Sequence, residues 1–68
     1  MTLDCRGMLC PLPVIKLAQA FPRLAVGDTI TVLADDPAAA TDIPAWCRMR
    51  SQELVSADDG QYVVRRLS

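Results

Sequence analysis

The sequence predicts an α/β fold: a two-layer α/β sandwich in which a four-stranded mixed sheet carries two helices on one face. Strand-like and helix-like apolar patterns alternate along the chain in the order β-α-β-α-β-β. Right-handed crossovers between the early strands would place both helices on the same face of the sheet. The 68 residues suffice for one modest core, so we expect a single domain over residues 1–68. Apolar residues make up 51% and charged residues 22%, which favours a folded domain over a disordered one.

Four stretches have the composition and alternation of strands. The first is Thr2–Cys5. The second is Thr29–Ala34, in which Ile30, Val32 and Ala34 alternate with Thr29, Thr31 and Leu33. The last two, Glu53–Ser56 and Gln61–Leu67, flank an Asp-Gly pair at residues 59–60. That pair favours a type I′ hairpin turn, so we expect these two strands to be antiparallel neighbours.

The first helix is predicted from Pro11 onwards and ends at Pro22, because proline cannot continue a helix. Its apolar residues recur at positions i, i+3, i+4 and i+7: Val14, Leu17, Ala18 and Phe21.

For the second helix, Asp36 is typical of an N-cap before a first-turn proline, but Pro44 would then lie in the helix interior. We therefore expect the helix that ends near Arg50 either to be distorted at Pro44 or, as we favour, to restart at Thr41 or Asp42.

Charge and composition exclude several classes of function. The net charge of −1 gives no basic surface for direct nucleic-acid binding. No apolar run approaches a membrane span, and the first ten residues do not resemble a signal peptide, so we expect a cytoplasmic monomer without membrane contact. Three cysteines cannot all pair, and without histidine or a Cys-x-x-Cys pair they do not favour a metal site. We expect neither a metal nor a cofactor.

Cys10 is the candidate reactive residue. If Pro11 occupies the first helical position, Cys10 becomes the N-cap, where the positive helix end would lower its thiol pKa. Arg6, four residues upstream across a turn at Gly7, could add positive charge, and the same field would stabilise a persulfide anion. The residues alone leave open the alternative that Cys10 is an inert, buried thiol.

The other cysteines fit the core. Cys5 shares one face of the first strand with Leu3, and Cys47 follows Ile43 by four residues on the second helix. We therefore expect both cysteines to lie in the core. The acidic pairs Asp35-Asp36 and Asp58-Asp59 lie in turn and capping contexts, which favours structural roles over paired-acid catalysis.

Two motifs resemble the signature of the TusA (SirA-like) sulfur-carrier family: LDCRG at residues 3–7 and CPLP at residues 10–13. The segments DDP at residues 35–37 and DIPAWCR at residues 42–48 are similar to the family's second-helix region. The sequence departs from the family at Ser51 and Gln52, where a Gly-His pair often precedes Glu-Leu.

This resemblance implies the sheet order 1-2-4-3 with strand 4 antiparallel, and it implies sulfur transfer. Cys10 would accept sulfur as a persulfide from a cysteine desulfurase or a rhodanese-like donor and pass it to an acceptor protein. Arg6, Gly7, Pro11 and Pro13 would support that site. Related carriers serve tRNA thiolation, molybdenum-cofactor metabolism or sulfur oxidation.

Two alternatives come from other classes of protein. One is a redox module that cycles Cys5 and Cys10 through a disulfide. The other is a regulatory domain that binds a partner through an apolar sheet face left uncovered by the helices.

Overall fold

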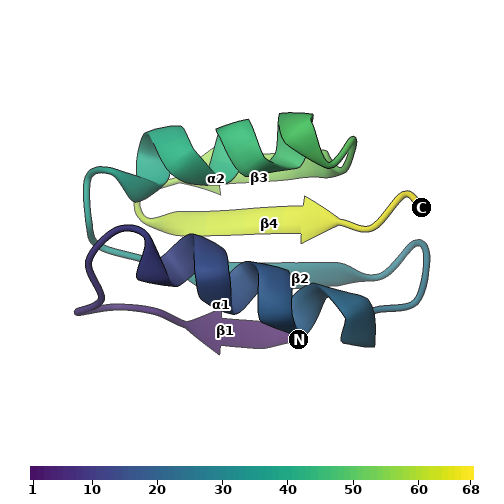
Figure 1. The fold of residues 1–68 in the computed structure, drawn as a ribbon, viewed down its shortest axis with the longest axis horizontal. Coiled ribbons are helices and arrows are strands. Elements are labelled where there is room, and N and C mark those ends of the chain that lie inside the picture. Colours follow the sequence, from purple (N-terminus) through teal and green to yellow (C-terminus); the bar gives the residue numbers. More distant parts are fainter.

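The computed structural model describes residues 1–68 and contains one mixed sheet in the order β1-β2-β4-β3 (Figure 1). Strand β1 (Thr2–Asp4) is parallel to β2 (Thr29–Leu33). Strand β4 (Gln61–Arg65) is antiparallel to β2 and to β3 (Glu53–Asp58). The predicted fold class and strand order are therefore confirmed.

Both helices cover the same face of the sheet and begin at the same end of it, on the left in Figure 1. Helix α1 (Leu12–Ala20) follows β1 and continues into a short 3-10 turn, Phe21–Arg23. Helix α2 (Ala39–Met49) follows β2. Because β1 and β2 are parallel, the loops after their carboxyl ends, which lead into α1 and α2, lie next to each other. Neither helix is long and apolar enough to cross a membrane.

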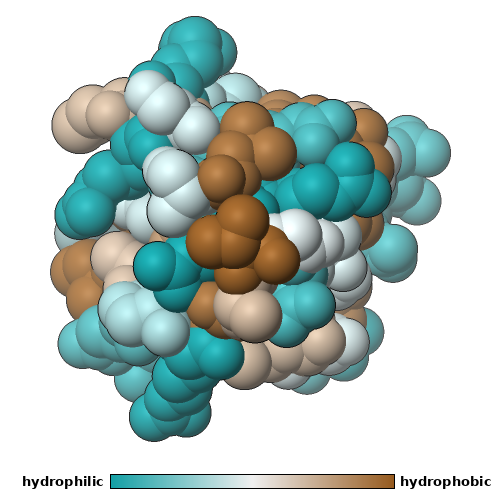
Figure 2. Space-filling model, turned by 90° about the vertical axis from the view of Figure 1, so that its right-hand side faces the viewer, coloured by the Kyte–Doolittle hydropathy of each residue, from teal (hydrophilic) through white to brown (hydrophobic).

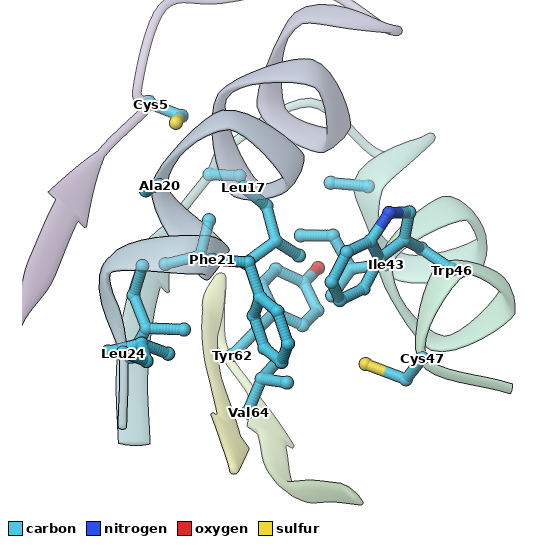
Figure 3. Packing of buried hydrophobic residues seen from close by; sticks show 14 residues of the cluster. Cys5, Leu17, Ala20, Phe21, Leu24, Ile43, Trp46, Cys47, Tyr62 and Val64 are labelled. Carbon is cyan, nitrogen blue, oxygen red and sulfur yellow. The ribbon is translucent and has the colours of Figure 1, made fainter. Parts of the chain in front are cut away.

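The core lies between the sheet and the two helices (Figure 3). Leu17, Ile30, Ile43, Val32 and Val64 are its fully buried aliphatic side chains. Phe21 and Trp46 join the two helices through an edge-to-face contact with ring centroids 5.1 Å apart. Of the predicted face of α1, Leu17 and Phe21 are buried, whereas Val14 and Ala18 pack against the core from its rim.

The start of α2 differs from the expectation. The predicted restart at Thr41 or Asp42 is wrong, because the helix begins at Ala39 and contains Pro44. The side chain of Asp36 accepts a hydrogen bond from the backbone N–H of Ala38, and its carbonyl accepts one from Ala39. These bonds start the helix three residues after Asp36, so Pro44 costs one interior hydrogen bond without ending the helix.

The β3–β4 hairpin has the predicted turn. Asp59 and Gly60 have φ values of 52° and 77°, as a type I′ turn requires. A Cβ atom at Gly60 would lie 2.7 Å from the carbonyl oxygen of Ala34, so both the backbone conformation and the close approach require glycine there.

The sheet face without helices is largely polar. Thr29 and Thr31 of β2 lie on it, opposite Arg65 and Val63 of β4. Arg65 also forms an ion pair with Glu53 of β3 at 2.9 Å. Leu33 and Val63 are apolar residues on this face, but polar residues surround them, which weakens the regulatory-domain alternative.

Figure 2 looks onto the end of the molecule away from the loops that follow β1 and β2, the right-hand side of Figure 1. A small group of apolar side chains lies there among hydrophilic ones. Val26 and Leu67, which precede β2 and follow β4, are among the exposed large hydrophobic residues of the chain. The loop between β1 and α1, which contains the only exposed cysteine, Cys10, lies at the opposite end.

Candidate functional site

Cys10 lies in the loop between β1 and α1 and is the one solvent-exposed thiol of the chain. Cys5 and Cys47 are buried, as predicted, and burial raises the pKa of both thiols. All three cysteines are free. Only Cys10 is placed to meet another molecule.

The beginning of α1 differs from the expectation by one residue. Leu12 is the first helical residue, Pro11 is the N-cap and the buried Pro13 occupies the second helical position. Cys10 therefore precedes the N-cap instead of occupying it. The peptide bond between Cys10 and Pro11 is cis. The helix-end field falls off within a turn and is weaker at Cys10 than the predicted N-cap position would provide.

Two carboxylates from the loop after β2 hold the backbone of the cysteine loop. Asp35 accepts a hydrogen bond from the N–H of Gly7 at 2.9 Å, and Asp36 accepts one from the N–H of Cys10 at 2.6 Å. Gly7 has a φ of 81°, which favours glycine at this turn. The structural roles expected for this acidic pair are thus found, but they include fixing the position of Cys10.

A third carboxylate contacts the sulfur itself. The thiol of Cys10 donates a hydrogen bond to Oδ2 of Asp42, in the first turn of α2, across 2.6 Å. This hydrogen bond raises the pKa of the Cys10 thiol, with further contributions from desolvation and from the charges of Asp42 and Asp36. The expected lowering of the Cys10 pKa is therefore wrong: the hydrogen bond to Asp42, desolvation and the neighbouring negative charges raise it instead.

Arg6 does not supply the positive charge that we expected beside Cys10. Its guanidinium forms an ion pair with Asp4 at 2.9 Å and a second hydrogen bond to the same carboxylate at 3.0 Å. Those hydrogen bonds lower the pKa of Asp4 to about 2. Arg6 therefore helps to fix the loop that begins after β1.

The structure brings Gly7, Cys10 and Pro11 together with three acids from the second β-α unit: Asp35, Asp36 and Asp42. Sequence reasoning missed the roles of Asp36 and Asp42 toward Cys10. The signal was present in the topology, because loops after neighbouring parallel strands meet at one edge of the sheet. No group of three side chains at this edge is arranged to hold a metal ion.

Beside the Cys10–Asp42 pair lies a shallow groove of about 230 Å³ between α1 and α2. It is lined by Pro11, Val14, Asp42, Ala45, Trp46 and Met49. The groove is open to solvent, so Cys10 is accessible to a large partner and is not enclosed around a small molecule.

Comparison with known proteins identifies the family and supports the fold. Residues 1–66 match the family model described as sulfurtransferase TusA. The crystal structure of a SirA-like protein from Desulfitobacterium hafniense is 29% identical in sequence and superimposes with a TM-score of 0.70. That match covers 93% of this chain and 89% of the other. On the evidence of its fold, its exposed Cys10 and this match along almost its whole length, the chain belongs to the TusA sulfurtransferase family.

Proposed function

We propose that this protein is a sulfur carrier that accepts sulfane sulfur as a persulfide on Cys10 and passes it to a partner protein. The observation that carries the proposal is the placement of one exposed thiol, fixed by a loop-to-loop hydrogen bond from Cys10 to Asp36, at the end of a TusA-family fold. Arg6, Gly7, Pro11 and Pro13 support the loop that presents it.

The proposed reaction exchanges one sulfur atom between two thiols. Cys10 Sγ bonds to the outer sulfur of a donor's persulfide, and the bond between that sulfur and the donor cysteine breaks. The donor leaves as a thiol and takes the proton that Cys10 loses, so atoms and electrons balance without an external oxidant. The reverse exchange delivers the sulfur to the acceptor.

The shape of the site favours protein partners over a small substrate. Cys10 is exposed and the neighbouring groove is shallow and open, so the domain cannot enclose a small molecule around the reacting sulfur. A cysteine desulfurase or a rhodanese-like protein would fit the role of donor. The reaction chemistry suits a cytoplasmic protein, since free thiols persist in reducing compartments.

The redox alternative is less well supported. A disulfide between Cys5 and Cys10 would have to expose a cysteine whose side chain is completely buried. The resting structure holds both as free thiols, one facing the core and one facing solvent.

Intact-mass measurement after incubation with a cysteine desulfurase and cysteine tests the proposal. The protein should gain one sulfur that dithiothreitol removes, whereas Cys10→Ser should gain none. Wild type that stays unmodified in the presence of active donor would reject the carrier function. Loss of two hydrogens, with no sulfur gained, would favour the disulfide alternative.

A further inference from the structure

The Asp42 carboxylate makes only one hydrogen bond to a side chain in this structure, and its donor is the Cys10 thiol. The neighbouring acids have backbone partners: Asp35 binds the N–H of Gly7, and Asp36 binds the N–H groups of Cys10 and Ala38. Asp42 lies in the first turn of α2, yet that helix has no side-chain cap. A capping role therefore does not explain why the Asp42 carboxylate points at the sulfur.

The hydrogen bond to Asp42 also disfavours the thiolate form of Cys10 when no donor is bound. The hydrogen bond to Asp42 raises the pKa of Cys10 most, desolvation adds to it, and the charges of Asp42 and Asp36 act in the same direction. Arg6, the nearest cation in the sequence, is paired with Asp4. Both acids favour the protonated thiol. A nucleophile that must attack a persulfide is thus kept in its less reactive form, with its proton directed at a carboxylate.

We propose that Asp42 is a catalytic residue that accepts the Cys10 proton as Cys10 attacks the donor persulfide, an inference that rests on the proposed carrier function. The S–H bond breaks as the new S–S bond forms, and the proton moves across the 2.6 Å contact to Asp42 Oδ2. The donor's S–S bond breaks in the same step. The departing thiolate then takes the proton from Asp42, directly or through water, which restores the carboxylate.

With this arrangement, Cys10 becomes nucleophilic only when a donor persulfide lies in position for attack. A free thiolate would react with any alkylating or oxidising agent that reached it, because the thiolate is the nucleophilic form. A thiol that loses its proton only while a persulfide is in position is protected between transfers. Asp42 is half-buried on a helix that packs against the core, so the acceptor is held in place.

Asp42→Asn tests the proposal because it preserves size and a hydrogen-bonding oxygen while it removes the negative charge and the basic group. We expect iodoacetamide to alkylate Cys10 faster in the variant, since the pKa of the thiol falls when the carboxylate is removed. We expect sulfur uptake from glutathione persulfide near neutral pH to become at least about tenfold slower, since a positioned general base contributes roughly a hundredfold or more. Glutathione persulfide is anionic, so removing the negative charge of Asp42 would by electrostatics alone make uptake faster. Slower uptake therefore indicates loss of the base.

A pH profile separates proton transfer from a structural role. Wild type should take up sulfur well below the thiol pKa, whereas the rate in the variant should rise with the thiolate fraction, about tenfold per pH unit. Asp28→Asn is the matched control: it removes one negative charge at the other end of β2 and retains an acceptor for the N–H of Ala25. The control should take up sulfur at the wild-type rate.

Equal or faster sulfur uptake by Asp42→Asn, in a protein that melts at the wild-type temperature, would overturn the role of Asp42. If the variant melts early, Asp42→Ser, which also lacks the carboxylate, replaces it as the test. Slower uptake with retained folding then supports the proposal, and uptake at the wild-type rate overturns it. Failure of wild type to take up sulfur from a cysteine desulfurase and cysteine would instead reject the carrier function. The two failures are therefore distinguishable.

Discussion

Replacing Asp36 should loosen the loop that presents Cys10 and lower the stability of the whole domain. Its two carboxylate oxygens serve different donors: Oδ2 accepts the N–H of Cys10 at 2.6 Å and Oδ1 accepts the N–H of Ala38 at 3.1 Å. A net hydrogen bond contributes about 1 kcal/mol, so Asp36→Ala should lower the free energy of unfolding by about 2 kcal/mol. Asp36→Asn has one acceptor oxygen in place of two and should lose about 1 kcal/mol.

These losses are large for a domain of this size. At about 0.05–0.15 kcal/mol per residue, 68 residues provide roughly 3–10 kcal/mol in total. Each kcal/mol shifts the melting temperature of so small a domain by about 4–8 °C, so Asp36→Ala should melt about 8–16 °C lower than wild type. Urea unfolding and thermal melts of the three proteins measure the series. Equal stability of wild type and Asp36→Ala, or equal losses in the two variants, would refute the assignment of one bond to each oxygen.

Further predictions concern the cysteines and the end of α2. Brief iodoacetamide treatment should label Cys10 first because it alone is exposed, and peptide mapping that finds Cys5 or Cys47 labelled equally fast would contradict the structure. The folded-state pKa values of Cys5 and Cys47 lie above the ordinary 9.0, so their stabilising contribution is present below pH 9.0 and is lost as pH rises through the raised values. The free energy of unfolding should therefore fall from about pH 8 to about pH 10 less steeply in a Cys5→Ala, Cys47→Ala double variant than in wild type, and identical slopes would contradict this. Ser51 has a φ of 56° just beyond the helix, a conformation that suits glycine, so Ser51→Gly should raise the free energy of unfolding by about 0.5–1 kcal/mol in urea unfolding, whereas a loss would contradict the strain.

Much of the fold could be predicted because it follows from short-range patterns. The alternation in residues 29–34 and the Asp-Gly turn identified the central strand and the hairpin, and Ile30, Val32 and Ala34 are indeed buried. The start of α2 could not be predicted as securely. Pro44 favoured a break in the helix. However, Asp36 accepts hydrogen bonds from the N–H groups of Ala38 and Ala39, which begin the helix earlier, and the packing of Ile43 and Trp46 stabilises it through the proline.

The reactive cysteine could be identified from the sequence, but the direction of its pKa shift could not. Cys10 could be singled out because a cysteine before a helix is easily recognised from the motif at residues 10–13. The sign of its pKa shift depends on Asp42, which is 32 residues away in the sequence and meets the thiol only through the packing of two β-α units. Arg6 was expected to act on Cys10, yet Asp4, two residues away, competes for it. The charged residues near Cys10 in the sequence therefore could not predict the direction in which its thiol pKa is shifted.

Locating the transferred sulfur among the three cysteines tests the central claim most directly. The protein would be loaded with a cysteine desulfurase and cysteine, alkylated at once and digested, and the peptides sequenced by mass spectrometry. The extra sulfur should lie on Cys10, while Cys5 and Cys47 remain unmodified because both are buried. Sulfur found on Cys5 or Cys47, with Cys10 unmodified, would contradict the account.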